Sequence, residues 1–166
     1  MSRRIVVVGC GGIADHLLHC LMMVLGQQNR DPYEVVLVDG DAFDETNRAR
    51  QTFRRLGPKA YVRREELGVI YPHVSIDAFP FFLSDRPDQL KLPTVKHPSE
   101  VIMEGDEIFL CVDNLDARRA ISVVAEQLSN VLIIDGGNEL TTGLVTYHLR
   151  INGVDVSPPA TKFRQM

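Results

Sequence analysis

Short runs of consecutive apolar residues alternate along the chain with longer segments in which apolar residues recur every three or four positions. The short runs are rich in Val, Ile and Leu, which is typical of strands buried on both faces of a parallel sheet. They predict strands at residues 4–8, 34–39, 106–113 and 131–135, and alternation at residues 74–79 predicts a further strand. The periodic segment at residues 13–25 predicts a helix, and we also expect helices in part of 48–55 and at 58–67 and 115–128. This alternation predicts an α/β fold with a doubly wound, mostly parallel Rossmann-like sheet and helices on both of its faces.

The last predicted element is a C-terminal antiparallel hairpin. Two segments at residues 143–150 and 154–156 flank Asn152-Gly153, and Asn-Gly supplies the two positive-φ positions of a type I′ turn. Residues 83–99 hold three prolines among scattered charges and give no clear prediction. With 166 residues, 45% of them hydrophobic, the chain is long enough for one compact domain and too short for two large ones.

The net charge hides an uneven distribution of bases. The chain has 18 Lys and Arg residues against 22 Asp and Glu residues, a net charge of −4, which argues against a general nucleic-acid or membrane-surface binder. Seven of the bases fall in residues 48–64, which contain no acid, and the rest of the chain has 11 bases and 22 acids. These seven are Arg48, Arg50, Arg54, Arg55, Lys59, Arg63 and Arg64. The segment predicts a site for a small polyanion, or for one face of a protein partner.

Two interpretations apply within this basic segment. Arg50 and Lys59 are candidates to hold the β- and γ-phosphates of a triphosphate, because attack at the α-phosphorus needs cations that offset the developing charge. The other bases fit solvated helix faces or partner contacts, since charge runs are commonly surface features. That second group contains Arg54, Arg55, Arg63 and Arg64.

The cysteines and the apolar stretches indicate the compartment. Cys10, Cys20 and Cys111 are too few and too irregularly spaced for a disulfide framework, and no C-x-x-C pair is available for a zinc site. We expect Cys10 and Cys111 to be small buried residues and Cys20 to be packed on the first helix. No apolar stretch is long enough to cross a membrane, and residues 1–4 lead directly into the first strand rather than into a secretory leader. We therefore expect a reducing, cytoplasmic location.

Small residues follow the first predicted strand and open the first helix. Gly9-Cys10-Gly11-Gly12 allows a tight turn and a close approach of backbone N–H groups to a phosphate. The simpler alternative is a turn that only packs the helix on the strand. Asp39 ends the second strand, where an acid can accept hydrogen bonds from ribose hydroxyls, or can simply be solvated.

Two polar residues follow the fourth predicted strand. Asp113 at this edge of the sheet has the hard oxygen ligands that Mg²⁺ prefers. Asp113 or Asn114 could equally cap the helix that begins near residue 115. At least one of Arg118 and Arg119, one turn into that helix, should face solvent.

Five ordered motifs resemble the signature of the ThiF/MoeB family and of the adenylation domains of ubiquitin-activating enzymes. They are Gly9-x-Gly-Gly-Ile13, Val38-Asp39-x-Asp41, Asn47-x-x-Arg50-Gln51, Gly57-Pro-Lys59-Ala60, and Cys111-x-Asp113-Asn114 with Arg118, and they fall between about residues 4 and 147. The resemblance implies an enzyme that binds ATP and Mg²⁺. It implies activation of the C-terminal glycine carboxylate of a ubiquitin-like or sulfur-carrier protein, or of a peptide, as an acyl-adenylate with release of pyrophosphate.

The resemblance also implies roles for single residues. Asp39 would hold the ribose, Arg50 and Lys59 would engage the phosphates in catalysis, and Asp113 would coordinate Mg²⁺. The residues expected to contact the nucleotide are Gly9, Gly11, Gly12, Asp39, Asp41, Asn47, Arg50, Gln51, Lys59 and Asn114.

The partners and the extent of the domain follow from the same comparison. We expect a β-grasp carrier or a peptide as substrate, a homodimer or heterodimer, and neither nucleic acid nor membrane as a partner. Residues 1–166 would form a single adenylation domain that lacks the C-terminal region in which many members carry two C-x-x-C zinc pairs. Two other functions stay open, a non-catalytic nucleotide-binding scaffold subunit and an NAD-dependent oxidoreductase.

Overall fold

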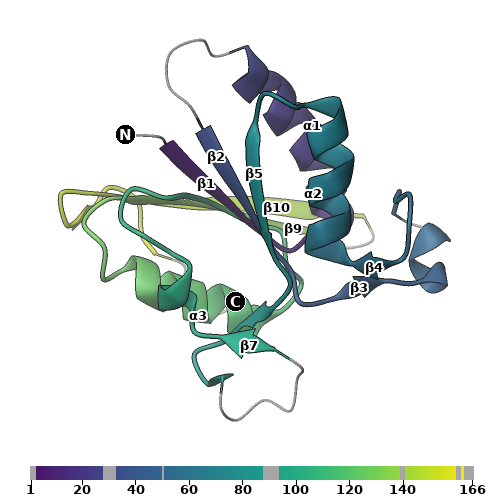
Figure 1. The fold of residues 1–166 in the computed structure, drawn as a ribbon. Coiled ribbons are helices and arrows are strands. Elements are labelled where there is room, and N and C mark those ends of the chain that lie inside the picture. Colours follow the sequence, from purple (N-terminus) through teal and green to yellow (C-terminus); the bar gives the residue numbers. More distant parts are fainter. Residues whose placement is uncertain are drawn as a thin grey trace.

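The computed structural model describes residues 3–27, 33–49, 51–87, 94–138, 141–159 and residue 162. Its main sheet has seven strands in the order β11-β10-β9-β8-β1-β2-β5 (Figure 1). Their bounds are β1 Arg3–Val8, β2 Tyr33–Val38, β5 Ser75–Phe79, β8 Glu107–Leu110, β9 Val131–Asn138, β10 Gly143–Ile151 and β11 Val154–Asp155. The pairings from β5 to β9 are parallel, and β9, β10 and β11 pair antiparallel. The mostly parallel sheet and the C-terminal hairpin predicted from the sequence are thus confirmed.

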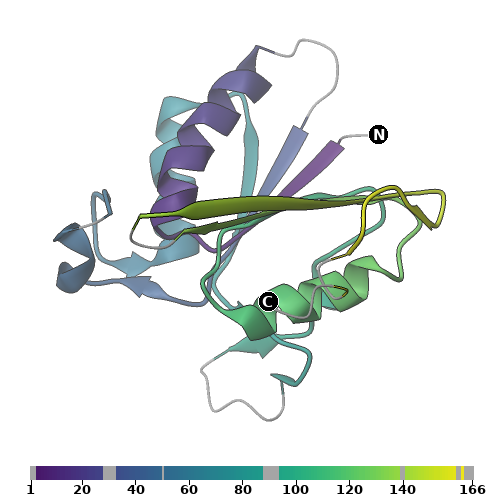
Figure 2. The ribbon, with the colours of Figure 1, turned by 180° about the vertical axis from the view of Figure 1, so that it is seen from behind.

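Helices cover both faces of the sheet. They are α1 (Gly12–Gly26) and α2 (Lys59–Ile70) on one face and α3 (Leu115–Ala125) on the other, as Figures 1 and 2 show. Alternate residues of β1 point to opposite sides: Ile5 and Val7 pack in the cluster of α1 and α2, whereas Val6 and Val8 pack in the cluster of α3. This explains why the strand is a continuous apolar run, since both of its faces are buried.

Smaller elements connect these layers. They are β3 (Ala42–Phe43), β4 (Gly57–Pro58), β6 (Phe82–Leu83) and β7 (Val95–Lys96), with 3₁₀ turns η1 (Glu45–Ala49) and η3 (Pro98–Glu100). The pair β3–β4 is antiparallel and β6–β7 is parallel. Asn152 and Gly153, between β10 and β11, have φ angles of 49° and 77°, which confirms both positive-φ positions of the predicted turn.

The partly helical stretch predicted at residues 48–55 is helical only at its start, as a 3₁₀ turn. The 3₁₀ turn η1 ends at Ala49, and residues 51–56 are not helical. The reason is tertiary packing, because Phe53 is buried and its ring stacks on Phe43 with 4.4 Å between the ring centroids. Val62 of α2 completes this small cluster. Residues 51–56 therefore form an irregular arm that carries Phe53 into the cluster.

The cysteines differ in part from expectation. Cys10 is buried and Cys111 is half-buried, but Cys20 is exposed on α1 rather than packed. Burial raises the pKa of both the Cys10 and the Cys111 thiols, that of Cys111 to about 12, which suits small packing residues rather than nucleophiles. Among the described helices, none combines the length and the apolar composition that a membrane crossing requires.

Candidate functional site

The glycine turn lies where three neighbouring strands end. Gly9 donates its backbone N–H to the Val38 carbonyl at the end of β2, and Cys111 after β8 donates to the Val8 carbonyl, both at 2.8 Å. Gly9 has a φ of 89°, and a Cβ atom built on it would lie 2.7 Å from the Cys111 carbonyl oxygen. Only glycine fits this conformation and this close approach. The role of Gly9 in the structure is therefore to make the turn.

The N-terminus of α1 is open at the end of that turn. Gly11 is the N-cap residue and offers no side chain to the first N–H groups of the helix. A Cβ atom on Gly12 would meet nothing within 4 Å. Free N–H groups and the positive end of the helix dipole form a suitable site for a phosphate. The expected placement of Gly11 and Gly12 at an accessible helix terminus agrees with the structure.

Asp39 forms hydrogen bonds with two loops next to the glycine turn. Its Oδ2 accepts the Cys10 backbone N–H at 2.6 Å, and its Oδ1 accepts the Asp41 backbone N–H at 2.8 Å. Burial raises the pKa of this carboxyl, although the two backbone hydrogen bonds act against the rise. A carboxylate has about four lone-pair positions, so Asp39 can hold the loops and still accept bonds from ribose hydroxyls.

Gln51 is brought to the glycine turn by the irregular arm. Its Nε2 lies 3.9 Å from the position of a Cβ atom on Gly11, and its backbone N–H donates to the Asn47 carbonyl at 3.0 Å. Asn47 is buried, with 7% of its surface exposed. The Oε1 atom of Gln51 is buried without a hydrogen-bond partner in the described part of the chain. A buried polar atom of this kind calls for a partner such as a ligand or a water.

Lys59 begins α2 and is held by Asp41. Its backbone N–H donates to the Asp41 carbonyl at 2.8 Å, and its Nζ lies 3.2 Å from Asp41 Oδ2. Through the bond from Asp41 to Asp39, the lysine shares one network with the glycine turn. Arg50, the other expected phosphate contact, lies outside the described residues.

The two polar residues after β8 separate into different roles. Asn114 Oδ1 accepts the Asp116 and Ala117 N–H groups at 2.9 and 3.4 Å, so Asn114 is the N-cap of α3. Asp113 is exposed at the same edge of the sheet, two residues after Cys111. Asp113 thus has an accessible carboxylate, whereas the amide oxygen of Asn114 is occupied by the cap. Nowhere in residues 3–27, 33–49, 51–87, 94–138, 141–159 and 162 do three His, Cys, Asp or Glu residues form a group that could hold a metal ion.

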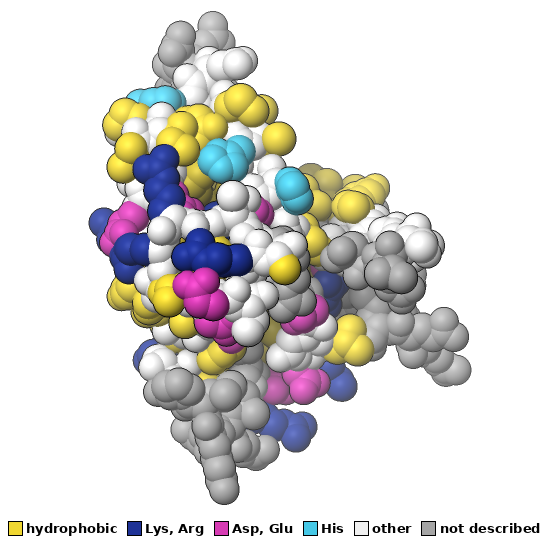
Figure 3. Space-filling view, turned by 90° about the vertical axis from the view of Figure 1, so that its right-hand side faces the viewer, with side chains coloured by type: hydrophobic (Ala, Val, Ile, Leu, Met, Phe, Trp, Pro, Cys, Tyr) yellow, Lys and Arg dark blue, Asp and Glu magenta, His cyan; other side chains and the backbone are white. Residues whose placement is uncertain are grey.

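Acids from other parts of the chain neutralise much of the basic segment. Four of its described bases form ion pairs: Arg48 with Glu45, Arg55 with Glu65, Lys59 with Asp41, and Arg63 with Asp15 and Glu66. Figure 3 shows dark blue and magenta side chains next to one another on this face. The expectation that Arg63 lies on a solvated surface is wrong, because its side chain is only 4% exposed. The count of bases in the sequence therefore overstates the free positive charge.

The ion pair and hydrogen bonds of Arg118 near the end of β8 were not predicted. The Arg118 guanidinium pairs with Asp135 of β9 and donates to the Val112 carbonyl and, at 3.0 Å, to the Gly136 carbonyl. Arg119 is exposed, which confirms that at least one of the two arginines faces solvent. Arg118 and Asp135 do not belong to one sequence motif, so their contact could be found only from the fold.

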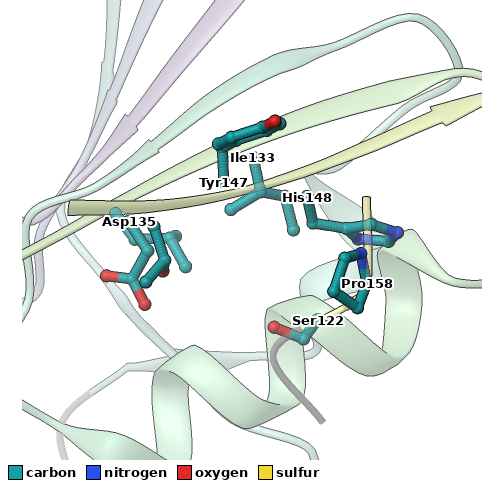
Figure 4. A pocket seen from close by; sticks show the side chains of 8 residues that line it. Ser122, Ile133, Asp135, Tyr147, His148 and Pro158 are labelled. Atoms are coloured by element: carbon teal, nitrogen blue, oxygen red, sulfur yellow. The ribbon is translucent and has the colours of Figure 1, made fainter. Parts of the chain in front are cut away.

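A small cavity lies between α3 and the β9–β10 pair (Figure 4). Asp135, His148 and Ser122 line it together with Pro158, and it has room for about one water molecule. Asp135 Oδ2 and His148 Nδ1 are buried there without hydrogen-bond partners among the described residues. None of the expected nucleotide contacts lines this cavity, so the candidate site is the open edge at the glycine turn.

Comparisons with solved structures support this fold. The chain is similar to E. coli MccB in its structures with ATP (20% identity, TM-score 0.65), with AMPCPP and MccA (20%, 0.64) and with MccA-N7isoASN (20%, 0.67). Each comparison covers 91% of this chain and 40–42% of MccB. This chain therefore spans about two fifths of the length of the structures it matches. At this level of identity the likeness shows the fold.

Comparison with known families is more specific. No curated protein matches the sequence. The ThiF family matches residues 1–158, almost the whole chain. The family suggested by the five motifs is confirmed, and the chain belongs to the ThiF family.

Proposed function

We propose that this chain binds ATP and transfers its AMP to the C-terminal carboxylate of a peptide or of a small ubiquitin-like or sulfur-carrier protein that ends in glycine. ThiF membership supports ATP-dependent adenylation, and the structures of MccB with ATP and with MccA support a nucleotide and a peptide as substrates. The observation that carries the proposal is the open N-terminus of α1 beside Gly11, next to the Oε1 of Gln51, for which the described residues provide no hydrogen-bond partner.

The reaction needs little covalent chemistry from the protein. A carboxylate oxygen of the substrate attacks the α-phosphorus, the bond from that phosphorus to the bridging oxygen breaks, and pyrophosphate leaves with the bonding electrons. Because nucleophile and target are both anionic, positioning and charge neutralisation supply the catalysis. Asp39 would orient the ribose, the N–H groups at Gly11 and Gly12 would approach the phosphates, and Lys59 and Arg50 would balance the charge of the leaving group.

Asp113 would hold the magnesium ion that accompanies ATP. The fit rests on an exposed carboxylate at the same sheet edge as the glycine turn, and Mg²⁺ typically takes one or two carboxylates together with phosphate and water oxygens. When bound, the ion would neutralise phosphate charge. Asn114, whose amide oxygen caps α3, would position this loop rather than contact the nucleotide through that atom.

We also propose that the protein works as a dimer in the cytoplasm. Alternation along β10 and β11 places five exposed apolar side chains on the face that α3 does not cover, and none of them belongs to the core under α1 and α2. They are Val145, Tyr147, Ile151, Val154 and Val156, with 45–72% of their surface exposed. A second copy of the chain would cover this face. Light scattering should show that Val145→Glu produces monomers, whereas Val69→Glu, at a similarly exposed site on α2, leaves the dimer intact.

ATP–pyrophosphate exchange tests the activity. The chain is incubated with ATP, Mg²⁺, labelled pyrophosphate and peptides or carrier proteins that end in Gly-Gly. We expect exchange that falls at least tenfold in Asp113→Asn and Lys59→Met and is unchanged in Arg64→Gln, a substitution of an exposed base. Exchange that survives both site substitutions would contradict the residue roles. Calorimetry that shows binding of NADH but not of ATP would reject the proposed function.

A further inference from the structure

A buried ion pair joins α1 to α2 beside the glycine turn, and no role proposed above uses it. Arg63 Nη2 lies 3.0 Å from Asp15 Oδ1, and the two side chains are 4% and 11% exposed. Arg63 Nη1 donates to Glu66 Oε2 at 3.1 Å, so the arginine faces two carboxylates. Because the Arg63 and Asp15 side chains are largely buried, removing Arg63 would leave the charge of Asp15 without compensation, at a large cost in stability.

The second oxygen of Asp15 holds the arm that carries Gln51. Asp15 Oδ2 accepts the backbone N–H of Thr52 at 3.2 Å and its hydroxyl at 3.0 Å. Thr52 directly follows Gln51, whose amide lies against Gly11. The position of Gln51 at the turn therefore depends on a carboxylate in the first turn of α1.

Arg63 is fixed from its other side by aromatic rings. Its guanidinium carbon lies 4.9 Å from the centroid of the Phe43 ring, which stacks on Phe53. Phe53 comes next after Thr52 in the same arm. The pair, the rings and the arm thus form one packed unit on the side of the glycine turn.

The charge of Asp15 has two opposing effects at the N-terminus of α1, and Arg63 offsets the unfavourable one. An acid in the first turn stabilises a helix by itself, but the same terminus is the proposed phosphate site, where an uncompensated carboxylate would repel a polyanion. We propose that Asp15 and Arg63 form a positioning pair for the nucleotide. Asp15 anchors Thr52 so that Gln51 stays at the glycine turn, and Arg63 cancels the charge of Asp15 so that a triphosphate can bind there. This inference rests on the proposed function.

Calorimetric titration with ATP and AMP measures the effect of charge separately from that of folding. Arg63→Gln leaves Asp15 and Glu66 unpaired, so the ratio of ATP affinity to AMP affinity should fall roughly tenfold, because the more highly charged nucleotide is repelled more strongly. Asp15→Asn in the same chain should restore this ratio to within about threefold, since it removes the charge in the first turn of α1 and leaves only that of Glu66 unpaired. Arg64→Gln, which removes the same charge from the adjacent exposed base, should leave the ratio unchanged.

Two further variants keep the test decisive if Arg63→Gln fails to fold. Arg63→Lys retains the charge and should keep the ATP-to-AMP ratio even if its thermal midpoint falls. Asp15→Asn alone should keep or raise the ratio. Equal losses for both nucleotides in Arg63→Gln, no recovery in the double variant, or a lower ratio in Asp15→Asn would each overturn the inference. Failure of the unsubstituted chain to bind ATP would instead overturn the proposed function.

Discussion

The substitution Gly9→Ala tests whether the first glycine of the turn serves the fold rather than the ligand. A Cβ atom at this position would lie 2.7 Å from the carbonyl oxygen and 2.8 Å from the carbonyl carbon of Cys111. That carbonyl cannot easily move away, since the Cys111 backbone N–H is bonded to the Val8 carbonyl at 2.8 Å. The substitution therefore forces strain into the junction of β1 and β8.

The magnitude has two parts. A non-glycine residue at a φ of 89° costs about 1–2 kcal/mol, and overpacking against backbone atoms costs about 1–3 kcal/mol. We expect Gly9→Ala to lower the free energy of unfolding by about 2–5 kcal/mol. Gly12→Ala is the matched control, because its Cβ meets nothing within 4 Å and alanine favours the helix that begins there by up to about 1 kcal/mol.

Urea unfolding followed by far-ultraviolet circular dichroism measures both values, and this probe suits a chain without tryptophan. A Gly9→Ala variant within about 0.5 kcal/mol of the parent would refute the steric reasoning. So would a Gly12→Ala variant that loses as much stability as Gly9→Ala, because the effect would then belong to the turn as a whole.

Three further predictions concern charge and thiols. Hydrogen bonds from His148 and Arg150 of β10 lower the pKa of Asp155 to about 2. Asp155 therefore contributes stability above its ordinary pKa of 3.8, and this stability is lost as the pH falls toward 2. Asp155→Asn should weaken the pH dependence of the urea midpoint over this range. Iodoacetamide at pH 8 should label exposed Cys20 at least roughly a hundredfold faster than Cys111, whose pKa is raised to about 12, as peptide mass spectrometry would show. Arg118→Met should destabilise the chain by about 3 kcal/mol, since it leaves buried Asp135 unpaired, and adding Asp135→Asn should recover part of the loss in urea unfolding.

The sequence was sufficient for the features that depend on neighbouring residues. Apolar runs identified β1 and β2 because both faces of these strands are buried, and Asn152-Gly153 identified the hairpin because its backbone conformation is set locally. The glycine turn could also be predicted, since strand, small residues and helix follow one another directly. These predictions needed no knowledge of which distant segments meet.

The features that the sequence left out depend on contacts between distant residues. The sequence predicted helical structure in part of residues 48–55, but Phe53 instead packs on Phe43 and draws the arm out of helical geometry. Asp15 gave no signal, because an acid in a first helical turn is ordinary. Its importance appears only when the fold places Thr52 and Arg63 against it.

The ion pair between Lys59 and Asp41 decides how the basic segment can act on a polyanion. Asp41 is 58% exposed, and an ion pair with a partner this exposed contributes about 0–1 kcal/mol. A phosphate oxygen accepts the same kind of charge-assisted hydrogen bond from an ammonium group as a carboxylate does. Exchanging Asp41 for a phosphate oxygen would thus cost little. The pair positions Lys59 beside the network of Asp39 and the glycine turn, where on the proposed function a nucleotide would replace Asp41 as its partner. On the proposed function, the positive charge that reaches the phosphates would therefore come from Lys59, from Arg50 and from the helix terminus, rather than from all seven bases that the sequence contains.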